Sequence, residues 1–207
     1  MITGLTGKYC AGKNHIAALL TKRGFPVLDV DVLGHSVIEI KKEELAARFG
    51  EDIITKRPGD IPGVNRRLLG EKVFGNEQEL AALEAIIHPE VNNLTLQWIK
   101  EQKGKNCIIN AALLHKSVVF TRLDCIILVN APWFVRLLRA KKRENLSWIE
   151  IFKRFSSQRK FTAQYLAGNA DIYRVENSSA GFWAGRQRSS AVRLERRIDE
   201  ILEKAGL

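Results

Sequence analysis

Short, mainly apolar runs alternate along this 207-residue chain with longer segments in which apolar residues recur at helical spacing. The runs at 106–109 and 124–129 are continuously apolar after their first residue, which is typical of central strands in a parallel sheet covered on both faces. Strands that alternate with helices predict an α/β fold with a doubly wound sheet. Five strands are expected, at residues 1–5, 25–28, 106–109, 124–129 and 171–175.

The amphipathic segments predict helices between and after these strands. Pro89 is expected to open a helix at its first turn, and residues 56–63, rich in Gly and Pro, predict a loop. The block between the second and third strands is too long for a plain crossover, so we interpret it as an inserted helical subdomain that binds substrate. The other expected helices cover residues 13–22, 42–49, 66–74, 77–87, 132–143, 148–158, 161–166 and 191–205.

Length and composition suit a single globular domain with an insertion, since 45% of the residues are apolar. No run approaches the roughly 20 apolar residues that a membrane span needs, and the first residues do not resemble a signal peptide. Three scattered cysteines, Cys10, Cys107 and Cys125, have no metal-binding spacing. An odd number of such cysteines predicts reduced thiols in a cytoplasmic protein. Because no apolar run is long enough for a span, no membrane partner is expected.

Charge predicts a polyanionic partner, because 33 basic and 23 acidic residues give a net charge of +10. Much of the excess lies at 136–143 and 186–197, where solvated helix faces are an alternative explanation. Nucleotides and nucleic acids are both candidates. A helix-turn-helix pattern, an aromatic RNA-binding signature and zinc spacing are all missing from the sequence, which favours a nucleotide over nucleic acid.

A phosphate-binding pattern follows the first predicted strand: Gly7-Lys8-Tyr9-Cys10-Ala11-Gly12-Lys13-Asn14. Glycines allow a backbone to wrap closely around phosphate oxygens, and the N-terminus of the following helix favours negative charge. The pattern predicts an ATP site with Lys13 on the β- and γ-phosphates. Other residues of this loop and helix start are expected to contact the nucleotide: Cys10, Ala11, Gly12, Asn14 and His15.

Asn14 stands where the pattern expects Ser or Thr, whose hydroxyl normally ligates Mg²⁺. An amide oxygen can also bind a hard cation, so we expect Asn14 to serve Mg²⁺ directly or through water. For His15, a simple surface position is an alternative to a role in the site.

The loop and several later segments together resemble the dephospho-coenzyme A kinase family. The resemblance extends from about residue 2 to residue 177 and rests on the order and spacing of the motifs. Residues 65–74 are similar to the family's Arg-Arg-x-Leu-x-x-x-Val-Phe segment, and 83–89 to its Leu-x-x-x-x-His-Pro segment. Further matches are Val27-Leu28-Asp29-Val30-Asp31, Leu113-Leu114, Arg139-x-x-x-Arg143 and Arg154-x-x-x-Gln158.

The resemblance implies a P-loop kinase that uses ATP and Mg²⁺ to phosphorylate the ribose 3′-hydroxyl of dephospho-coenzyme A. It implies a core at about 1–31, 104–135 and 169–207, a substrate subdomain at about 32–103 and a lid at about 136–168. The chain is expected to be a monomer or a weak homo-oligomer.

The resemblance also implies roles for individual residues. Asp31, expected at the end of the second strand, would be the catalytic base, although a helix N-cap is an alternative. Arg139 would stabilise the transferring phosphoryl group. Arg143 and Arg154 would close over ATP. Three residues would face the coenzyme substrate: Arg66, His88 and Leu113.

The sequence departs from the family pattern at Asn14, at Ala112 in place of Pro and at Lys116 in place of Glu. Two alternatives therefore stay open. One is another small-molecule kinase of the same fold, acting on a nucleoside, a nucleotide or a similar alcohol. The other is a basic nucleic-acid-binding protein with a degenerate P-loop.

Overall fold

The computed structural model describes residues 1–55, 62–143, 147–158, 161, 165, 170–178 and 187–207. The chain divides into two compact units. Residues 1–28 and 100–207 form the first, which holds the main sheet, and residues 29–99 form the second, which is mainly helical.

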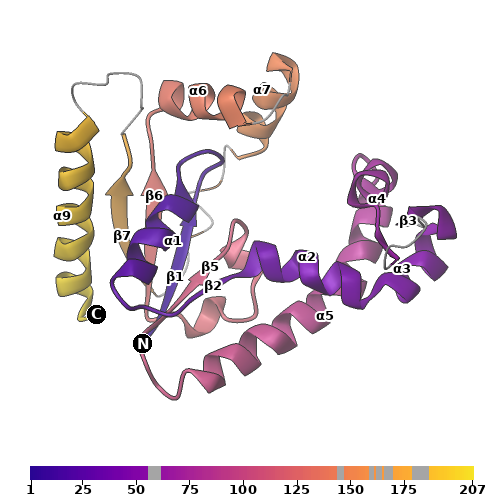
Figure 1. Cartoon of the computed structure of the whole chain (residues 1–207), viewed down its shortest axis with the longest axis horizontal. Helices are drawn as coiled ribbons and strands as arrows, with labels where there is room; N and C mark the ends of the chain where they lie inside the picture. The colour runs from indigo at the N-terminus through magenta and orange to yellow at the C-terminus, as the bar shows by residue number, and fades with distance from the viewer. Residues whose placement is uncertain (56–61, 144–146, 159–160, 162–164, 166–169, 179–186) are drawn as a thin grey trace. The chain divides into compact units, whose positions relative to one another are not determined.

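A five-stranded parallel sheet organises the first unit, as the sequence predicted, with strand order β2-β5-β1-β6-β7 (Figure 1). Gly4 of the central strand β1 stands opposite both Ile109 of β5 and Ile126 of β6. The strands are β1 (Ile2–Gly7), β2 (Val27–Asp29), β5 (Cys107–Asn110), β6 (Cys125–Asn130) and β7 (Asp171–Glu176).

The core of the first unit explains why the central strands read as unbroken apolar runs. All four residues of β5 are buried, and Ile127 and Val129 of β6 pack with Ile16 of α1 (Lys13–Lys22) and Ile198 of α9 (Gln187–Ala205). A strand covered on both faces has no exposed side on which polar residues could alternate. This core fixes β1 and α1, and therefore the loop between them.

Two further helices follow β6, namely α6 (Trp133–Arg143) and α7 (Trp148–Ser157). A capping box begins α7, because Ser147 Oγ accepts from the Glu150 amide and the Glu150 side chain accepts from the Ser147 amide at 2.8 Å. Short 3₁₀ segments, η2 (Leu114–Lys116) and η3 (Phe120–Arg122), connect β5 to β6. The helix predicted at 161–166 falls outside the described residues except for Phe161 and Tyr165.

The second unit has its own apolar core. Its helices are α2 (Val30–Ile40), α3 (Lys42–Phe49), α4 (Arg66–Val73) and α5 (Glu77–Glu101), the last of which continues into the first unit. One cluster joins Leu45, Ile53 and Leu69, and another joins Val37, Ile87 and Val91. A small hairpin of β3 (Ile54–Thr55) and β4 (Gly63–Val64) follows the 3₁₀ segment η1 (Glu51–Ile53). Residues 56–61 of the predicted loop lie outside the described part.

Two predictions in this unit were wrong. Asp31 does not end a strand, because β2 ends at Asp29 and α2 begins at Val30. Asp29 is the N-cap, and its Oδ1 accepts from the amides of Asp31 and Val32 at 3.0 and 3.1 Å. Pro89 does not open a helix but lies inside the 25-residue α5. Proline removes one backbone hydrogen bond there, yet Ile87 and Val91 on either side bury their side chains, so packing maintains the helix.

No helix in the described ranges combines the length and the apolar character that crossing a membrane requires.

Candidate functional site

The loop between β1 and α1 has the backbone geometry that its glycines suggested. Gly12 is the N-cap of α1 with φ 95° and ψ 30°, in the left-handed region that favours glycine. A Cβ atom at this position would overlap Nδ2 of Asn177. Cys10 also has a positive φ, 59°, and the Ala11 amide closes a turn on the Lys8 carbonyl at 2.9 Å. Within the described residues, no side chain caps the first turn of α1.

Carbonyl groups of this loop are bound by side chains from distant parts of the chain. Arg136 Nε donates to the Tyr9 carbonyl at 2.8 Å. Arg139 Nη1 donates to the carbonyls of Cys10 and Ala11 at 3.3 and 3.0 Å, and Asn177 Nδ2 donates to that of Ala11 at 2.9 Å. The C=O and N–H groups of a peptide unit point in opposite directions. Holding the carbonyls of Tyr9 and Ala11 therefore turns the amides of the same peptide units, those of Cys10 and Gly12, toward the other side, where an anion could bind.

Arg139 and Asn177 also bind each other. Arg139 Nη2 donates to the backbone oxygen of Asn177 at 3.1 Å and to its Oδ1 at 3.2 Å. Burial lowers the pKa of Arg139 and of Arg136 from the usual arginine value. A guanidinium nevertheless keeps its charge at neutral pH, so the loop is held by two partly buried cations. Their charges add to the attraction of this site for phosphate.

Helix α7 contacts the loop through Tyr9. The Tyr9 amide donates to Oε1 of Gln158 at 2.7 Å, and Arg154 Nη1 donates to the Tyr9 hydroxyl at 3.4 Å. The Tyr9 ring meets that of Phe155 edge-on at 5.9 Å, and the Arg136 guanidinium lies 4.4 Å from the centre of the Phe155 ring. A cavity of about 460 Å³ opens here, lined by Lys8, Trp133, Arg136, Phe152, Phe155, Ser156 and Gln158.

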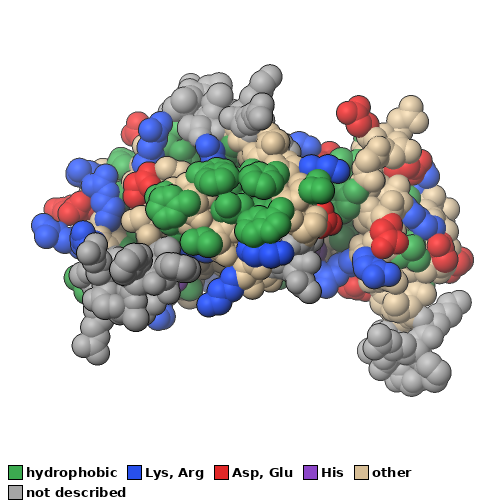
Figure 2. Space-filling view, turned by 90° about the horizontal axis from the view of Figure 1, so that it is seen from above, with side chains coloured by type: hydrophobic (Ala, Val, Ile, Leu, Met, Phe, Trp, Pro, Cys, Tyr) green, Lys and Arg blue, Asp and Glu red, His purple; other side chains and the backbone are tan. Residues whose placement is uncertain are grey.

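Helices α6 and α7 also present an apolar surface. Figure 2 shows hydrophobic side chains gathered on the face seen from above. Large apolar side chains on these two helices are exposed, from 42% for Leu138 to 69% for Ile149. Two of them, Trp133 and Phe152, also line the cavity beside Lys8. The complete set on the two helices is Trp133, Phe134, Leu138, Trp148, Ile149 and Phe152.

Two amides meet where β5 ends and α1 begins. Asn110, the last residue of β5, donates its Nδ2 hydrogen to Oδ1 of Asn14 at 3.4 Å. Asn110 is buried, whereas Asn14, the second residue of α1, is exposed. This is the position at which the sequence predicted a metal ligand. Groups of three or more His, Cys, Asp or Glu that could hold a metal ion do not occur among the described residues.

A buried tyrosine supports the end of β1. The hydroxyl of Tyr165, which is fully buried, lies 3.4 Å from Thr6 Oγ1 and 3.3 Å from His115 Nδ1. It donates to the Ala112 carbonyl at 3.5 Å. Burial lowers the pKa of His115, and the neighbouring Lys116 lowers it further. The neutral imidazole is therefore favoured near the end of the strand that leads into the loop.

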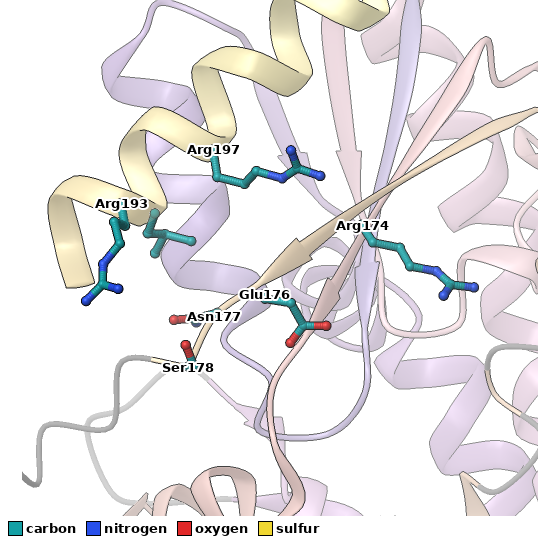
Figure 3. Close-up of a pocket in the computed structure, with 7 residues that line it drawn as sticks. Arg174, Glu176, Asn177, Ser178, Arg193 and Arg197 are labelled. Atoms are coloured by element: carbon teal, nitrogen blue, oxygen red, sulfur yellow. The ribbon is translucent and has the colours of Figure 1, made fainter. Parts of the chain in front are cut away.

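A second cavity, of about 430 Å³, lies at the end of β7 (Figure 3). Glu176 accepts from Asn130 Nδ2 at 2.7 Å, and Arg197 pairs with Glu200 at 3.0 Å. Arg193 and Arg197 of the predicted basic segment 186–197 line this cavity, and Asn177 joins the cavity to the phosphate loop. The lining residues are Arg174, Glu176, Asn177, Ser178, Arg193, Leu194 and Arg197.

The predicted site residues fall into two groups. Cys10, Ala11 and Gly12 lie in the loop beside Arg139, and Lys13, Asn14 and His15 form the first turn of α1. Leu113 and Arg143 are exposed in the same unit. The others belong to the second unit: Asp31 in the first turn of α2, Arg66 at the start of α4 and His88 in α5.

Sequence reasoning missed several residues that hold the loop. Arg136, Asn110 and Tyr9 carried no signal of their own. Gln158 was noticed only as part of a matched segment, and Asn177 only as the end of the range that the resemblance covers. Their backbone and side-chain contacts join positions 96 or more residues apart, which a pattern of spacing does not contain.

A parallel sheet whose central strand leads through a glycine loop into a helix defines this chain as a P-loop kinase by class. The model of one family, dephospho-CoA kinase, matches residues 1–180. The chain belongs to the dephospho-CoA kinase family.

Individual relatives agree with this assignment. A dephospho-CoA kinase of Treponema denticola is 31% identical over 213 residues, which cover 100% of this chain and 91% of the relative. One from Thermus thermophilus is 35% identical over 158 residues, 76% of this chain and 75% of the relative. A crystal structure of a Thermus thermophilus protein has a TM-score of 0.74 and 31% identity over 93% of this chain and 94% of that one.

A dephospho-CoA kinase structure from Campylobacter jejuni has a TM-score of 0.63 over 99% of this chain and 96% of that one. At 20% identity it shows the shared fold.

Proposed function

We propose that this chain transfers the γ-phosphoryl group of ATP to the ribose 3′-hydroxyl of dephospho-coenzyme A. The observation that carries the proposal is the loop of residues 7–12, whose carbonyls are bound by Arg136, Arg139 and Asn177, in a member of this kinase family. A loop held in this way has its backbone conformation fixed before ATP binds, which lowers the cost of reorganisation on binding.

Lys13 and the start of α1 would bind the β- and γ-phosphates. Lys13 is the first residue of the helix, where the helix dipole and the ammonium group act in the same direction. Ala11, Gly12, Asn14 and His15 would line the phosphate site. The amides of Ala11 and His15 already donate to the carbonyls of Lys8 and Gly12, so we assign backbone donation to phosphate to Gly12 and Asn14. Because charge shifts onto the leaving oxygens during transfer, these donors stabilise the transition state as well as bound ATP.

Asp31 would accept the proton of the attacking hydroxyl. An alcohol becomes a better nucleophile when a carboxylate within hydrogen-bond reach accepts its proton. Asp31 is exposed in the first turn of α2, and Asp29 fixes this turn by binding the Asp31 amide. We assign Arg66, His88 and Leu113 to the binding of the coenzyme substrate, on the strength of the family resemblance.

Arg139 has a different assignment from the one that the sequence suggested. Its guanidinium donates to carbonyls of the loop and to Asn177, so we assign it the role of positioning the loop. A direct contact between Arg139 and the transferring phosphoryl group stays a prediction. Arg143 and Arg154 would close over ATP, with Arg154 already stacked 5.4 Å from the centre of the Tyr9 ring.

The residues at the expected metal position do not match the usual Mg²⁺ donor set. Other P-loop enzymes hold the ion with a loop hydroxyl and a strand-end carboxylate, whereas this chain has the amides of Asn14 and Asn110. We therefore derive no catalytic step through a metal bound by these side chains. The free thiols of Cys107 and Cys125, in the described part of the chain, support a reducing, cytoplasmic location.

Mass spectrometry of the reaction product tests the proposal. The protein is incubated with ATP, Mg²⁺ and dephospho-coenzyme A, and coenzyme A is expected to accumulate with a mass increase of one phosphoryl group. Lys13→Ala serves as the matched inactive control. Failure with dephospho-coenzyme A, together with phosphorylation of a nucleoside or another alcohol from a panel, would assign the chain a different substrate.

A further inference from the structure

The hydrogen bond between Asn110 and Asn14 joins two amide side chains that are 96 residues apart in the sequence. In P-loop enzymes the hydroxyl of the loop and a carboxylate of the neighbouring strand act together on Mg²⁺. Here the last residue of the strand beside β1 bonds directly to residue 14, so Asn110 occupies the place of that carboxylate. Both partners are amides, and the pair carries no negative charge.

We propose that the Asn14–Asn110 pair makes ATP binding by this loop nearly independent of a divalent cation. This inference rests on the proposed function, because it takes ATP as the ligand. It goes further because it assigns to two named side chains the relative affinity of the site for free ATP and for Mg²⁺-bound ATP.

Charge provides the physical reason. A strand-end carboxylate repels the phosphates of free ATP and attracts the same phosphates once they carry Mg²⁺, so it separates the two forms. A neutral amide repels the phosphates of free ATP much less, and it attracts phosphates that carry Mg²⁺ much less. Moreover, Oδ1 of Asn14 already accepts a hydrogen from Asn110, and a cation would have to compete for that oxygen. The loop amides, Lys13 and the arginines behind the loop act on the phosphates in both forms.

Equilibrium binding of ATP, measured by calorimetry in Mg²⁺ and in EDTA, tests the inference without any catalytic readout. For the parent protein, the Kd in EDTA is expected to lie within about threefold of the Kd in Mg²⁺, the scale of a weak ionic contact. Asn110→Asp should raise this ratio to about tenfold or more, because the new carboxylate weakens binding of free ATP and favours the Mg²⁺ form.

Two further variants examine the pair itself. Asn14→Asp puts a carboxylate on the exposed partner and should raise the ratio in the same direction, whether or not the buried Asn110→Asp variant folds. Asn14→Thr combined with Asn110→Asp should raise it beyond the product of the two single effects, since contacting residues are coupled. Asn106→Asp is the matched control: it adds the same charge immediately before β5, where Asn106 Oδ1 accepts from the chain N-terminus.

The possible results separate this inference from the function on which it rests. A parent ratio of about tenfold or more in favour of Mg²⁺ would overturn the inference and leave the kinase proposal standing. The same holds if folded Asn110→Asp and Asn14→Asp both keep the parent ratio. An increase that Asn106→Asp reproduces would show a general effect of charge and would also overturn it. No ATP binding in either buffer would contradict the proposed function itself.

Discussion

Asn177 donates its Nδ2 hydrogen to the carbonyl oxygen of Ala11 at 2.9 Å, although 166 residues separate them in the sequence. Asn177 follows directly after β7, and its own amide donates to the Asn130 carbonyl at the end of β6 at 2.8 Å. The ends of two strands are thus tied to the phosphate loop through one buried residue. Arg139 binds the same side chain and the same carbonyl, which makes a closed network behind the loop.

Asn177→Ala should therefore weaken ATP binding and destabilise the protein together. The substitution leaves the Ala11 carbonyl and part of the Arg139 guanidinium with fewer partners in a buried place, at a cost of about 1–3 kcal/mol. Urea unfolding and ATP binding measure the two effects. Asn130→Ala is the control, because the Asn130 side chain binds the exposed Glu176 instead. Equal effects of the two variants would show that the loop does not depend on the Asn177 side chain.

Gly12→Ala should abolish most ATP binding. Gly12 has a positive φ, and an added Cβ would also overlap Asn177 Nδ2, so the substitution combines backbone strain with displacement of the network. Gly24→Ala separates these causes: Gly24 has φ 88° and open space around its Cβ position. Gly24→Ala should cost only the strain of roughly 1–2 kcal/mol and leave ATP affinity unchanged. Loss of binding in both would indicate global destabilisation.

The fold class could be predicted because burial leaves a direct trace in the sequence. Helices 13–22 and 42–49 have the predicted bounds, and the five-stranded sheet was confirmed. Errors arose where polar residues join an element or packing overrides a local rule. Asn110 belongs to β5 although it ends the apolar run, and Pro89 stays inside α5. The two-residue strands β3 and β4 are too short to show any period.

The candidate site was less predictable than the fold. The loop pattern identified Lys13 and Gly12, since steric and electrostatic needs restrict those positions to few residue types. Arg139 was expected at the phosphates, which stays a prediction, and its guanidinium donates to the loop carbonyls and to Asn177. A sequence shows that an arginine is present. It does not show which acceptor the guanidinium binds, because that depends on contacts across the fold.

Acidification should destabilise the protein partly through His115. Burial lowers its pKa below 6.5 in the folded state, so the unfolded chain binds the proton more readily. Stability is therefore retained above the unfolded pKa and falls as the pH drops through 6.5 toward the folded pKa. His115→Gln should reduce this fall in urea unfolding between about pH 7 and 5. The exposed His15→Gln variant should keep the parent's pH dependence. An unchanged profile for His115→Gln would exclude a contribution from this group.

Asp31→Asn should lower kcat by roughly 10²–10⁴-fold while ATP affinity stays nearly constant, as expected for loss of a general base. Asp29→Asn is a closely matched control, because it removes one carboxylate two residues away. Asp29 caps α2 through Oδ1, and asparagine caps helices about as well as aspartate, so this variant should keep both the helix and the rate. Single-turnover measurements with dephospho-coenzyme A, alongside ATP binding, compare the two. If Asp29→Asn lowers the rate as strongly as Asp31→Asn, the carboxylate that accepts the proton is not confined to Asp31, and the family resemblance has assigned the base too narrowly.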